Sequence, residues 1–198
     1  ARINELETLH TISTSLRTIQ TIDKTLSTLL DNTLSTLETT AGQIMLHDPL
    51  RNELRDVVSR GWFASMNNMP IKVGEGVAGK VFASGELYTS DEFIRDSLPH
   101  ASTRNGIPAG WGGVCLPIRT STEVIGVLFV SVQLPRQISS QQISLLESLV
   151  DMAGSAVHRM RLYSETARRA EEFESLYDMS KTLSAEYDLN SLLGVIVK

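Results

Sequence analysis

Three glycines, at positions 74, 76 and 79, have the G-x-G-x-x-G spacing with which dinucleotide-binding proteins hold a pyrophosphate. That chemistry needs a long buried strand before the glycines and a parallel βαβ unit around them. Only a short apolar stretch, residues 71–73, precedes these glycines, and antiparallel strands are expected after them. The spacing therefore favours a structural turn that opens a helix over residues 76–83. The N-terminus of such a helix is still a suitable place for a phosphate group.

The thiol and imidazole groups show no catalytic arrangement. Cys115 is the one cysteine of the chain and stands between Val114 and Leu116 in an apolar stretch, which favours the role of a small buried residue. The histidines, at positions 10, 47, 100 and 158, include no pair with the i, i+4 spacing of a helical metal site. No Ser-His-Asp or paired-carboxylate pattern is present. We predict a protein without catalytic residues and without a metal site.

Aromatic and cationic residues gather around a long polar stretch, residues 91–112. A mostly apolar cavity with a few polar groups is how small-molecule sites are built. The alternative is that these aromatic side chains fill the core under the stretch and leave no cavity. We predict a small-molecule pocket lined by Trp62, Val77, Phe82, Asp91, Phe93, Ile94, Arg104, Trp111 and Cys115.

The elements that must position these residues are mainly strands. Hydrophobic patterning predicts strands at residues 41–47, 53–60, 71–73, 87–90, 114–119 and 124–132. Leu54, Asp56 and Val58 are expected on one face of the second strand. The last two strands are almost wholly apolar, which is typical of strands covered on both faces. The expected fold class is α/β, or α+β: a mainly antiparallel sheet of five or six strands, with the terminal helices on one face and helix 76–83 and the long stretch on the other.

Both termini read as helices. A leucine stripe marks the first, and a second stripe begins after a capping serine, Ser139 or Ser140. The stripes consist of Leu26, Leu29, Leu30, Leu34 and Leu37, and of Ile143, Leu146, Val150, Ala153, Val157 and Met160. The second helix continues past Glu172, and roughly 40 residues at about 1.5 Å each span about 60 Å, more than one small domain can cover. We expect a parallel homodimer through the terminal helices.

Composition limits the partners. The chain has 198 residues, a net charge of −5 and 41% hydrophobic residues, which is ordinary for a soluble globular protein. No clustered basic face suggests nucleic acid, and no apolar run reaches the roughly 18 residues of a membrane span. A single cysteine is compatible with a reducing compartment, so we expect a cytoplasmic location without direct membrane contact.

Four segments together resemble a GAF domain, a sensory relative of the PAS fold. They are Gly74–Val81 (GEGVAGKV), Asp91, Leu116-Pro117-Ile118 and Ile125–Leu128. The resemblance covers roughly residues 20–155. It implies a non-catalytic sensory module of a bacterial signalling protein, such as a sensor histidine kinase or a cyclic-dinucleotide enzyme, which binds a small molecule and signals through its helices. The alternative is a structural dimerisation or spacer module without a ligand.

The same resemblance bears on cofactors and ligands. Relatives that attach a bilin use a cysteine beside a histidine, which Cys115 lacks, and the surroundings of His100 are not distinctive for haem. We therefore expect neither group. The residues Asp91-Glu92-Phe93 do not follow the order found in cyclic-nucleotide-binding relatives, which weakens a cyclic GMP assignment. A related enzyme that reduces free methionine sulfoxide uses several cysteines, so that activity is not expected here.

An internal repeat suggests a tandem array. Residues 9–16 align with residues 176–183 at an offset of 167 residues, about one domain with its linker. We interpret residues 1–38 as an N-terminal dimerisation helix and residues 39–135 as the GAF core. Residues 136–172 are then a signalling helix, and residues 173–198 the start of a second copy in a longer protein.

Overall fold

The computed structural model describes residues 22–66, 70–97 and 106–196. The chain divides after His158 into two units, which are described separately. A helix over residues 22–36 opens the first described part. The elements that follow are β1 (Ala41–Asp48), β2 (Glu53–Arg60), η1 (Gly61–Ser65), β3 (Ile71–Lys72), α2 (Gly76–Ser84), β4 (Tyr88–Ser90), η2 (Phe93–Arg95), β5 (Trp111–Arg119), β6 (Val124–Gln133) and α4 (Ser140–Ile196). The part of the N-terminal helix expected before residue 22 lies outside the described residues.

The six strands form one sheet in the order β3-β2-β1-β6-β5-β4. Every neighbouring pair is antiparallel, which confirms the expected sheet and excludes the parallel βαβ unit of a dinucleotide-binding fold. Strand β5 begins at Trp111, three residues before the expected start. The predicted polar stretch ended at residue 112, because glycines are more typical of loops than of strands. Gly113 has a different role: a Cβ there would overlap the carbonyl oxygen of Val130 in β6, so a glycine is needed where the two strands approach closely.

The predicted faces of β2 are wrong beyond Asp56. In the pairing with β1, Asp56 lies opposite Met45 and Val58 lies opposite Ile44, with an irregularity between the two pairs. Met45 and Ile44 are neighbours in one strand and therefore point to opposite faces. Val58 consequently shares the face of Ile44, whereas Asp56 shares that of Met45. A β-bulge inserts one extra residue and reverses the alternation after it, which periodicity alone does not reveal.

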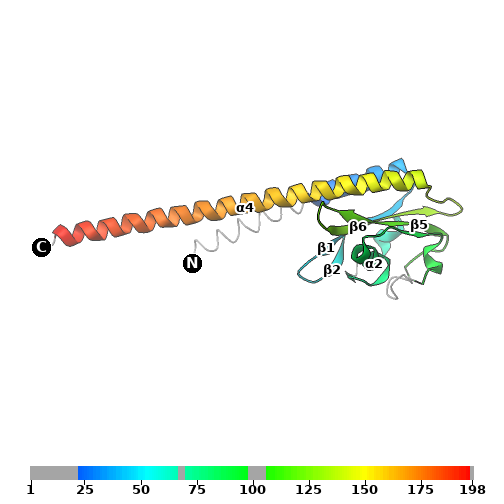
Figure 1. Ribbon diagram of the computed structural model, residues 1–198, viewed down its shortest axis with the longest axis horizontal. Helices are drawn as coiled ribbons and strands as arrows, with labels where there is room; N and C mark the ends of the chain where they lie inside the picture. The colour runs from blue at the N-terminus through cyan, green and yellow to red at the C-terminus, as the bar shows by residue number, and fades with distance from the viewer. Residues whose placement is uncertain (1–21, 67–69, 98–105, 197–198) are drawn as a thin grey trace. The chain divides into compact units, whose positions relative to one another are not determined.

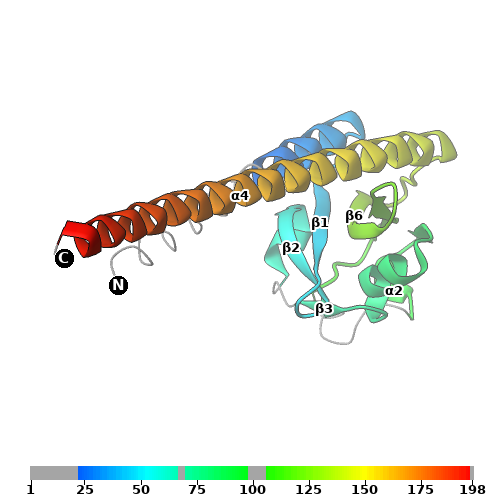
Figure 2. The same ribbon diagram turned by 60° about the vertical axis from the view of Figure 1, so that its left-hand side comes forward.

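Helix 22–36 and the first part of α4 cover one face of the sheet (Figures 1 and 2). Leu30 and Leu34 lie directly over Gly42 of β1, and Arg60 of β2 binds Asp31 of the helix with Nε and Oδ1 2.8 Å apart. The buried apolar side chains of this layer are those of Leu26, Leu30 and Leu34 in the first helix, Leu37 just after it, and Leu146, Val150, Ala153 and Val157 in α4. Most of both predicted stripes is thus confirmed as core within residues 22–158, whereas Leu29 and Ile143 are only half-buried.

Helix α2 lies on the opposite face, here called the site face (Figure 1). The turn before it is closed by hydrogen bonds from Glu75 N to Lys72 O (3.0 Å) and from Gly74 N to Gly79 O (2.9 Å). The glycine segment therefore has the structural role that its spacing favoured. The buried cluster on the site face consists of Ala41, Met45, Leu54, Phe63, Val77, Ala78, Val81, Phe93, Ile107, Cys115, Val127 and Phe129.

From Arg159 onward α4 belongs to the second unit. Exposed ion pairs with i, i+4 spacing support it, Arg169–Glu165 at 2.6 Å and Arg168–Glu172 at 3.6 Å. Large apolar side chains are exposed along the same stretch of helix. They are Leu162, Tyr163, Phe173, Leu176, Tyr177 and Met179. None of the described helices combines the length and the apolar character that crossing a lipid bilayer would require.

Gly154 tests the packing of α4 on the sheet. A Cβ at this position would overlap the carbonyl oxygen of Arg119 at the end of β5. Gly154→Ala should raise intrinsic helix propensity by about 1 kcal/mol. We nevertheless expect a net destabilisation of about 1–3 kcal/mol. The atom that the new methyl group would meet belongs to the backbone of β5, which cannot move aside as a flexible side chain can. Urea unfolding followed by tryptophan fluorescence measures it, since Trp62 and Trp111 both lie in the unit of residues 19–158.

The matched control is Ser155→Ala, at the next and exposed position of α4. This change gains similar helix propensity without a steric cost, so the stability should stay within about 0.5 kcal/mol of the starting value or rise. An equal or higher stability of Gly154→Ala would show that α4 does not pack against Arg119 as closely as described.

Candidate functional site

Three phenylalanines fill the centre of the site face. Phe129 of β6 lies 5.4 Å from Phe63 of η1 and 6.3 Å from Phe93 of η2, measured between ring centroids. All three are buried. The two short helical turns, η1 after β2 and η2 after β4, therefore meet over the middle of the sheet. Sequence patterning left both regions as loops or short turns, because contacts between residues far apart in the chain hold them.

Two buried polar atoms near this cluster have no hydrogen-bond partner. The indole of Trp62 stacks on Phe63 at 3.8 Å and lies 6.3 Å from Phe93. Its Nε1–H is buried without an acceptor, and the Ser90 hydroxyl is buried without a partner, the residue being only 9% exposed. Ser90 pairs with Gly113 and Tyr88 with Cys115, so Ser90 shares the site face with Cys115. These are the two such side-chain atoms among the described residues.

An unpaired buried polar group costs roughly 1–3 kcal/mol, so each requires a physical reason. Both residues can donate a hydrogen bond, Trp62 as a donor only and Ser90 as a donor or an acceptor. Trp62 was among the predicted site residues, whereas Ser90 was missed. A serine in a short strand is unremarkable in sequence, and only its burial without a hydrogen-bond partner singles it out.

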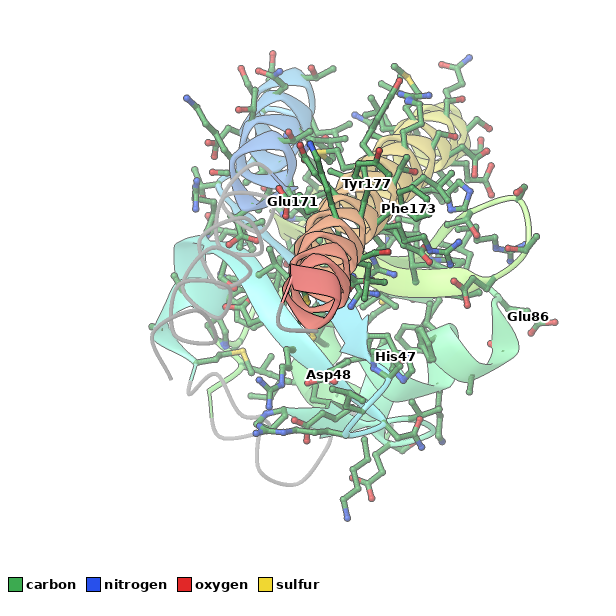
Figure 3. All side chains as sticks on the ribbon, turned by 90° about the vertical axis from the view of Figure 1, so that its left-hand side faces the viewer. His47, Asp48, Glu86, Glu171, Phe173 and Tyr177 are labelled. Carbon is green, nitrogen blue, oxygen red and sulfur yellow. The ribbon has the colours of Figure 1, made fainter. Side chains whose placement is uncertain are left out.

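The structure brings five further predicted residues to the site face. Val77 of α2 and Cys115 of β5 are buried in its cluster, and Phe93 covers its centre. Phe82 and Trp111 are half-buried and pack against the same cluster. The Phe82 ring also lies 4.5 Å from the ring of His47, which Figure 3 shows beside Asp48 at the end of β1.

The other three predicted residues do not join them. Asp91 is exposed, and its Oδ1 accepts a hydrogen bond from Gln137 Nε2 at 3.3 Å. Ile94 is 36% exposed, unlike its neighbour Phe93. Arg104 lies outside the described residues. In a 3₁₀ turn successive side chains point in different directions, so Phe93 and Ile94 cannot both face the core.

Polar contacts hold the segment around η2. The Tyr88 hydroxyl donates to Asp96 Oδ2 at 2.6 Å. Glu92 accepts from Gly110 N at 2.8 Å and pairs with Arg95 Nε at 2.6 Å. Residues 92 and 110 are thus tied together at the base of the long stretch that the sequence singled out. Sequence reasoning missed this role of Glu92, because the partner is a backbone amide eighteen residues away.

Titration behaviour on the site face follows burial. Burial raises the pKa of the Cys115 thiol well above its ordinary value. Burial is also the main cause that raises the pKa of Tyr88, and the hydrogen bond to Asp96 and the charge of that carboxylate add to it. A buried, protonated thiol is a poor nucleophile, which agrees with the predicted apolar role of Cys115.

An open surface groove with a volume of about 500 Å³ runs along the outer side of β2. It is lined by Asp23, Lys24, Ser27, Asp56, Val57, Val58, Ser59, Arg60 and Ala64, none of them a predicted site residue. Some of the polar groups in the groove already have partners within the protein. Arg60 donates to Ser27 Oγ at 2.7 Å and forms an ion pair with Asp31. Among the residues described, no three His, Cys, Asp or Glu side chains are placed to hold a metal ion.

Tyr88 gives a pH-dependent prediction. The pKa of Tyr88 is higher in the folded protein than the roughly 10 of an exposed tyrosine. Its contribution to stability is therefore complete below about pH 10 and is lost as the pH rises from there toward the folded-state pKa. Tyr88→Phe should lower the stability at pH 8 by about 1–2 kcal/mol through loss of the bond to Asp96. It should also flatten the decline above pH 10.

Urea unfolding at pH 8 and at several values above pH 10 measures both effects. Tyr163→Phe is the control, since Tyr163 is exposed and should change neither the stability at pH 8 nor the slope. Equal slopes for the original protein and Tyr88→Phe would contradict the buried phenol.

Comparisons with known proteins agree with this architecture. The family model described as GAF domain matches residues 20–158. The GAF domain/HD domain protein from Geobacter sulfurreducens is 17% identical, with a TM-score of 0.64 over 73% of this chain and 96% of that chain. The domain of a putative two-component sensor histidine kinase from Sinorhizobium meliloti is 19% identical, with a TM-score of 0.57 over 74% and 97%.

An enzyme shares the fold as well. The free methionine-R-sulfoxide reductase from Neisseria meningitidis is 16% identical, with a TM-score of 0.59 over 72% of this chain and 81% of that chain. No curated protein matches this chain. At these identities the likeness to solved structures shows the fold, whereas the family model covers well over half of the chain. The chain belongs to the GAF domain family.

Proposed function

We propose that residues 19–158 are a non-catalytic sensory module that binds a small molecule on the site face, beside η1 and η2. The observation that carries the proposal is the pair of buried polar atoms without partners, Trp62 Nε1 and Ser90 Oγ. Folded proteins rarely leave such groups unpaired, and functional sites are where they persist. A bound molecule that accepts hydrogen bonds from both residues would remove the penalty.

The chemistry of the two atoms limits the ligand. Because the indole N–H can only donate, the ligand must present an acceptor, such as a carbonyl, carboxylate or phosphate oxygen. The three phenylalanines fill the centre of the site face. The ligand would therefore be small and partly apolar, held at the edge of this cluster rather than in its middle. The polar-anchor pattern agrees with how small-molecule sites are built.

The burial of Cys115 supports a non-catalytic role. The reductase from Neisseria meningitidis shows that the fold can host chemistry, but this chain has one cysteine, and it is fully buried. A buried thiol with a raised pKa and no second cysteine cannot complete a thiol–disulfide cycle within the chain. The Sinorhizobium meliloti relative belongs to a putative sensor histidine kinase, which supports signalling to an output domain of that kind. A cyclic-dinucleotide enzyme is the alternative output domain in our proposal.

The Trp62 and Ser90 side chains provide the test. Ser90→Ala removes its unpaired polar atom with little change in shape, and the free protein should be as stable as before or more stable, because the burial penalty disappears. Trp62→Phe removes the indole N–H together with one ring, so its gain is offset by lost packing against Phe63. Native mass spectrometry of the protein purified from cell extract should show a bound small molecule. Its occupancy should fall in each variant, because the loss of a hydrogen bond worth roughly 1–2 kcal/mol weakens the affinity about five- to thirtyfold.

Ser131→Ala is the matched control, because this buried serine does have a partner. Its hydroxyl donates to Gly112 O at 2.9 Å. Here we expect a loss of stability of about 1 kcal/mol and an unchanged occupancy. An empty original protein, or unchanged occupancy in both test variants, would contradict the sensory proposal and favour a spacer module.

A second candidate role, dimerisation, is favoured by the far part of α4. Phe173 and Tyr177 are 74% and 63% exposed, and Figure 3 shows both on one side of the helix, with Glu171 on another. They continue a stripe with alternating four- and three-residue steps, which is the repeat of a two-stranded coiled coil. The stripe runs through Leu145, Leu149, Met152, Ala156, Arg159, Tyr163, Thr166, Ala170, Phe173, Tyr177 and Ser180. We propose a second copy of this chain as its partner, in parallel.

Charge placed in the stripe tests this role. The double variant Phe173→Glu/Tyr177→Glu puts like charges at the proposed seam and should convert a dimer into a monomer at micromolar concentration. Light scattering after size-exclusion chromatography measures the mass. The control is Arg161→Glu, which changes the net charge by the same amount but lies about 180° around the helix from the stripe. Dimers that persist in the double variant would contradict the seam.

A further inference from the structure

The short connection between β6 and α4, residues 134–139, is called the link here. Although it has no regular structure, three hydrogen-bonded contacts hold it to distant parts of residues 19–158. Leu134 N donates to Gly110 O at 2.8 Å. Gln137 Nε2 donates to Asp91 Oδ1 at 3.3 Å. Arg136 donates from Nη1 to Glu38 O at 2.9 Å and from Nη2 to Leu37 O at 2.5 Å.

Two of these contacts reach residues beside elements of the site face. Asp91 precedes η2, and Gly110 directly precedes β5. Glu92, which is 13% exposed, joins the same two regions by accepting from Gly110 N at 2.8 Å. Gly110 is thus held from both sides, by Glu92 through its amide and by Leu134 through its carbonyl. A shift of η2 that moves either region must stretch one of the contacts to the link.

The third contact reaches the helices on the other face. Leu37 and Glu38 follow helix 22–36, where the last carbonyls lack partners within the helix. The Arg136 guanidinium binds the carbonyl oxygens of Leu37 and Glu38 and so places a positive charge at the negative end of the helix dipole. The link also leads into α4. Ser139 N bonds Gln142 Oε1 (3.0 Å) and Gln142 N bonds Ser139 Oγ (3.3 Å), a reciprocal cap at the first turn of α4.

We infer that the link couples the site face to the two helices, with Glu92, Gln137 and Arg136 as its positioning residues. This inference rests on the proposed sensory function, because it states how occupancy of the site would reach the helices. The contacts form one continuous chain from Glu92 through Gly110, Leu134 and Arg136 to the end of helix 22–36. Such a chain carries coupling only if disturbing one end changes the other, and the effect must be reciprocal.

Hydrogen exchange of the full chain, without added ligand, tests the coupling. Glu92→Ala should speed exchange at residues 92–97 and 106–112. It should also speed exchange roughly three- to tenfold at residues 34–39 and 139–143, because the contacts held through Gly110 weaken. Arg136→Gln should reciprocally speed exchange at residues 106–112. Glu92→Gln keeps an acceptor oxygen for Gly110 N and should restore most of the protection.

The control is Glu53→Ala, which breaks the ion pair with Arg55 (2.9 Å) near the turn between β1 and β2. Exchange should change only near that turn, and the amides in the middle of β1 (residues 43–45) and of β5 (residues 114–118) should keep their protection in every variant. Gln137→Ala removes an exposed contact and should leave the protein folded even if the other variants do not fold. It should give the same remote pattern more weakly. Faster exchange near Glu92 with unchanged exchange at residues 34–39 and 139–143 would overturn the coupling.

The two proposals fail in different ways. The exchange experiment contains no ligand, so a missing remote effect would refute the link while leaving the Trp62 and Ser90 site to its own test. Unchanged ligand occupancy in the Trp62 and Ser90 variants would refute the site, while a reciprocal exchange pattern would still show that the link connects the two faces.

Discussion

Strands β5 and β6 are buried on both faces, and the rest of the fold depends on this constraint. From residue 112 to 118 and from residue 125 to 132 every side chain is buried. Alternation sends Val114 and Leu116 toward the helices and Cys115 toward the site face. A strand pair of this kind cannot face water on either side, so two covering layers are obligatory. Because packed cores do not deform continuously, a displacement in one layer must be accommodated by the other.

The layer on the site face is built from short pieces. Helix α2, η1 and η2 are each nine residues or fewer and are held by aromatic contacts and by Glu92, rather than by long hydrogen-bonded elements. Segments of this kind open at low cost. One unpaired buried atom, Trp62 Nε1, belongs to this layer, and the other, Ser90 Oγ, belongs to β4 of the sheet. The proposed ligand site therefore lies where short, separately held pieces meet the sheet.

The opposite layer is built from two helices. Helix 22–36 and the first turns of α4 pack on the sheet through continuous apolar stripes, and Gly154 lets the backbone of α4 approach β5 closely. Rigid elements of this kind shift as bodies rather than locally, as in known switching transitions. The link is the connection that we propose between the two layers, since Arg136 binds the end of one helix and the chain leads from it into the other.

Hydrophobic periodicity and glycine turns are local signals, so the strands, the helix stripes, the antiparallel sheet and the family resemblance were predictable from the residues alone. The same patterns pointed to Trp62, Val77, Phe82, Phe93, Trp111 and Cys115, all of which lie on the site face. The bulge that turns Val58 to the other face, the early start of β5 and the outward position of Ile94 were not predictable, because they depend on contacts between distant segments. Ser90, Glu92 and Arg136 emerged only from the tertiary structure, since their roles depend on burial or on backbone partners far away in the chain, which no local pattern encodes.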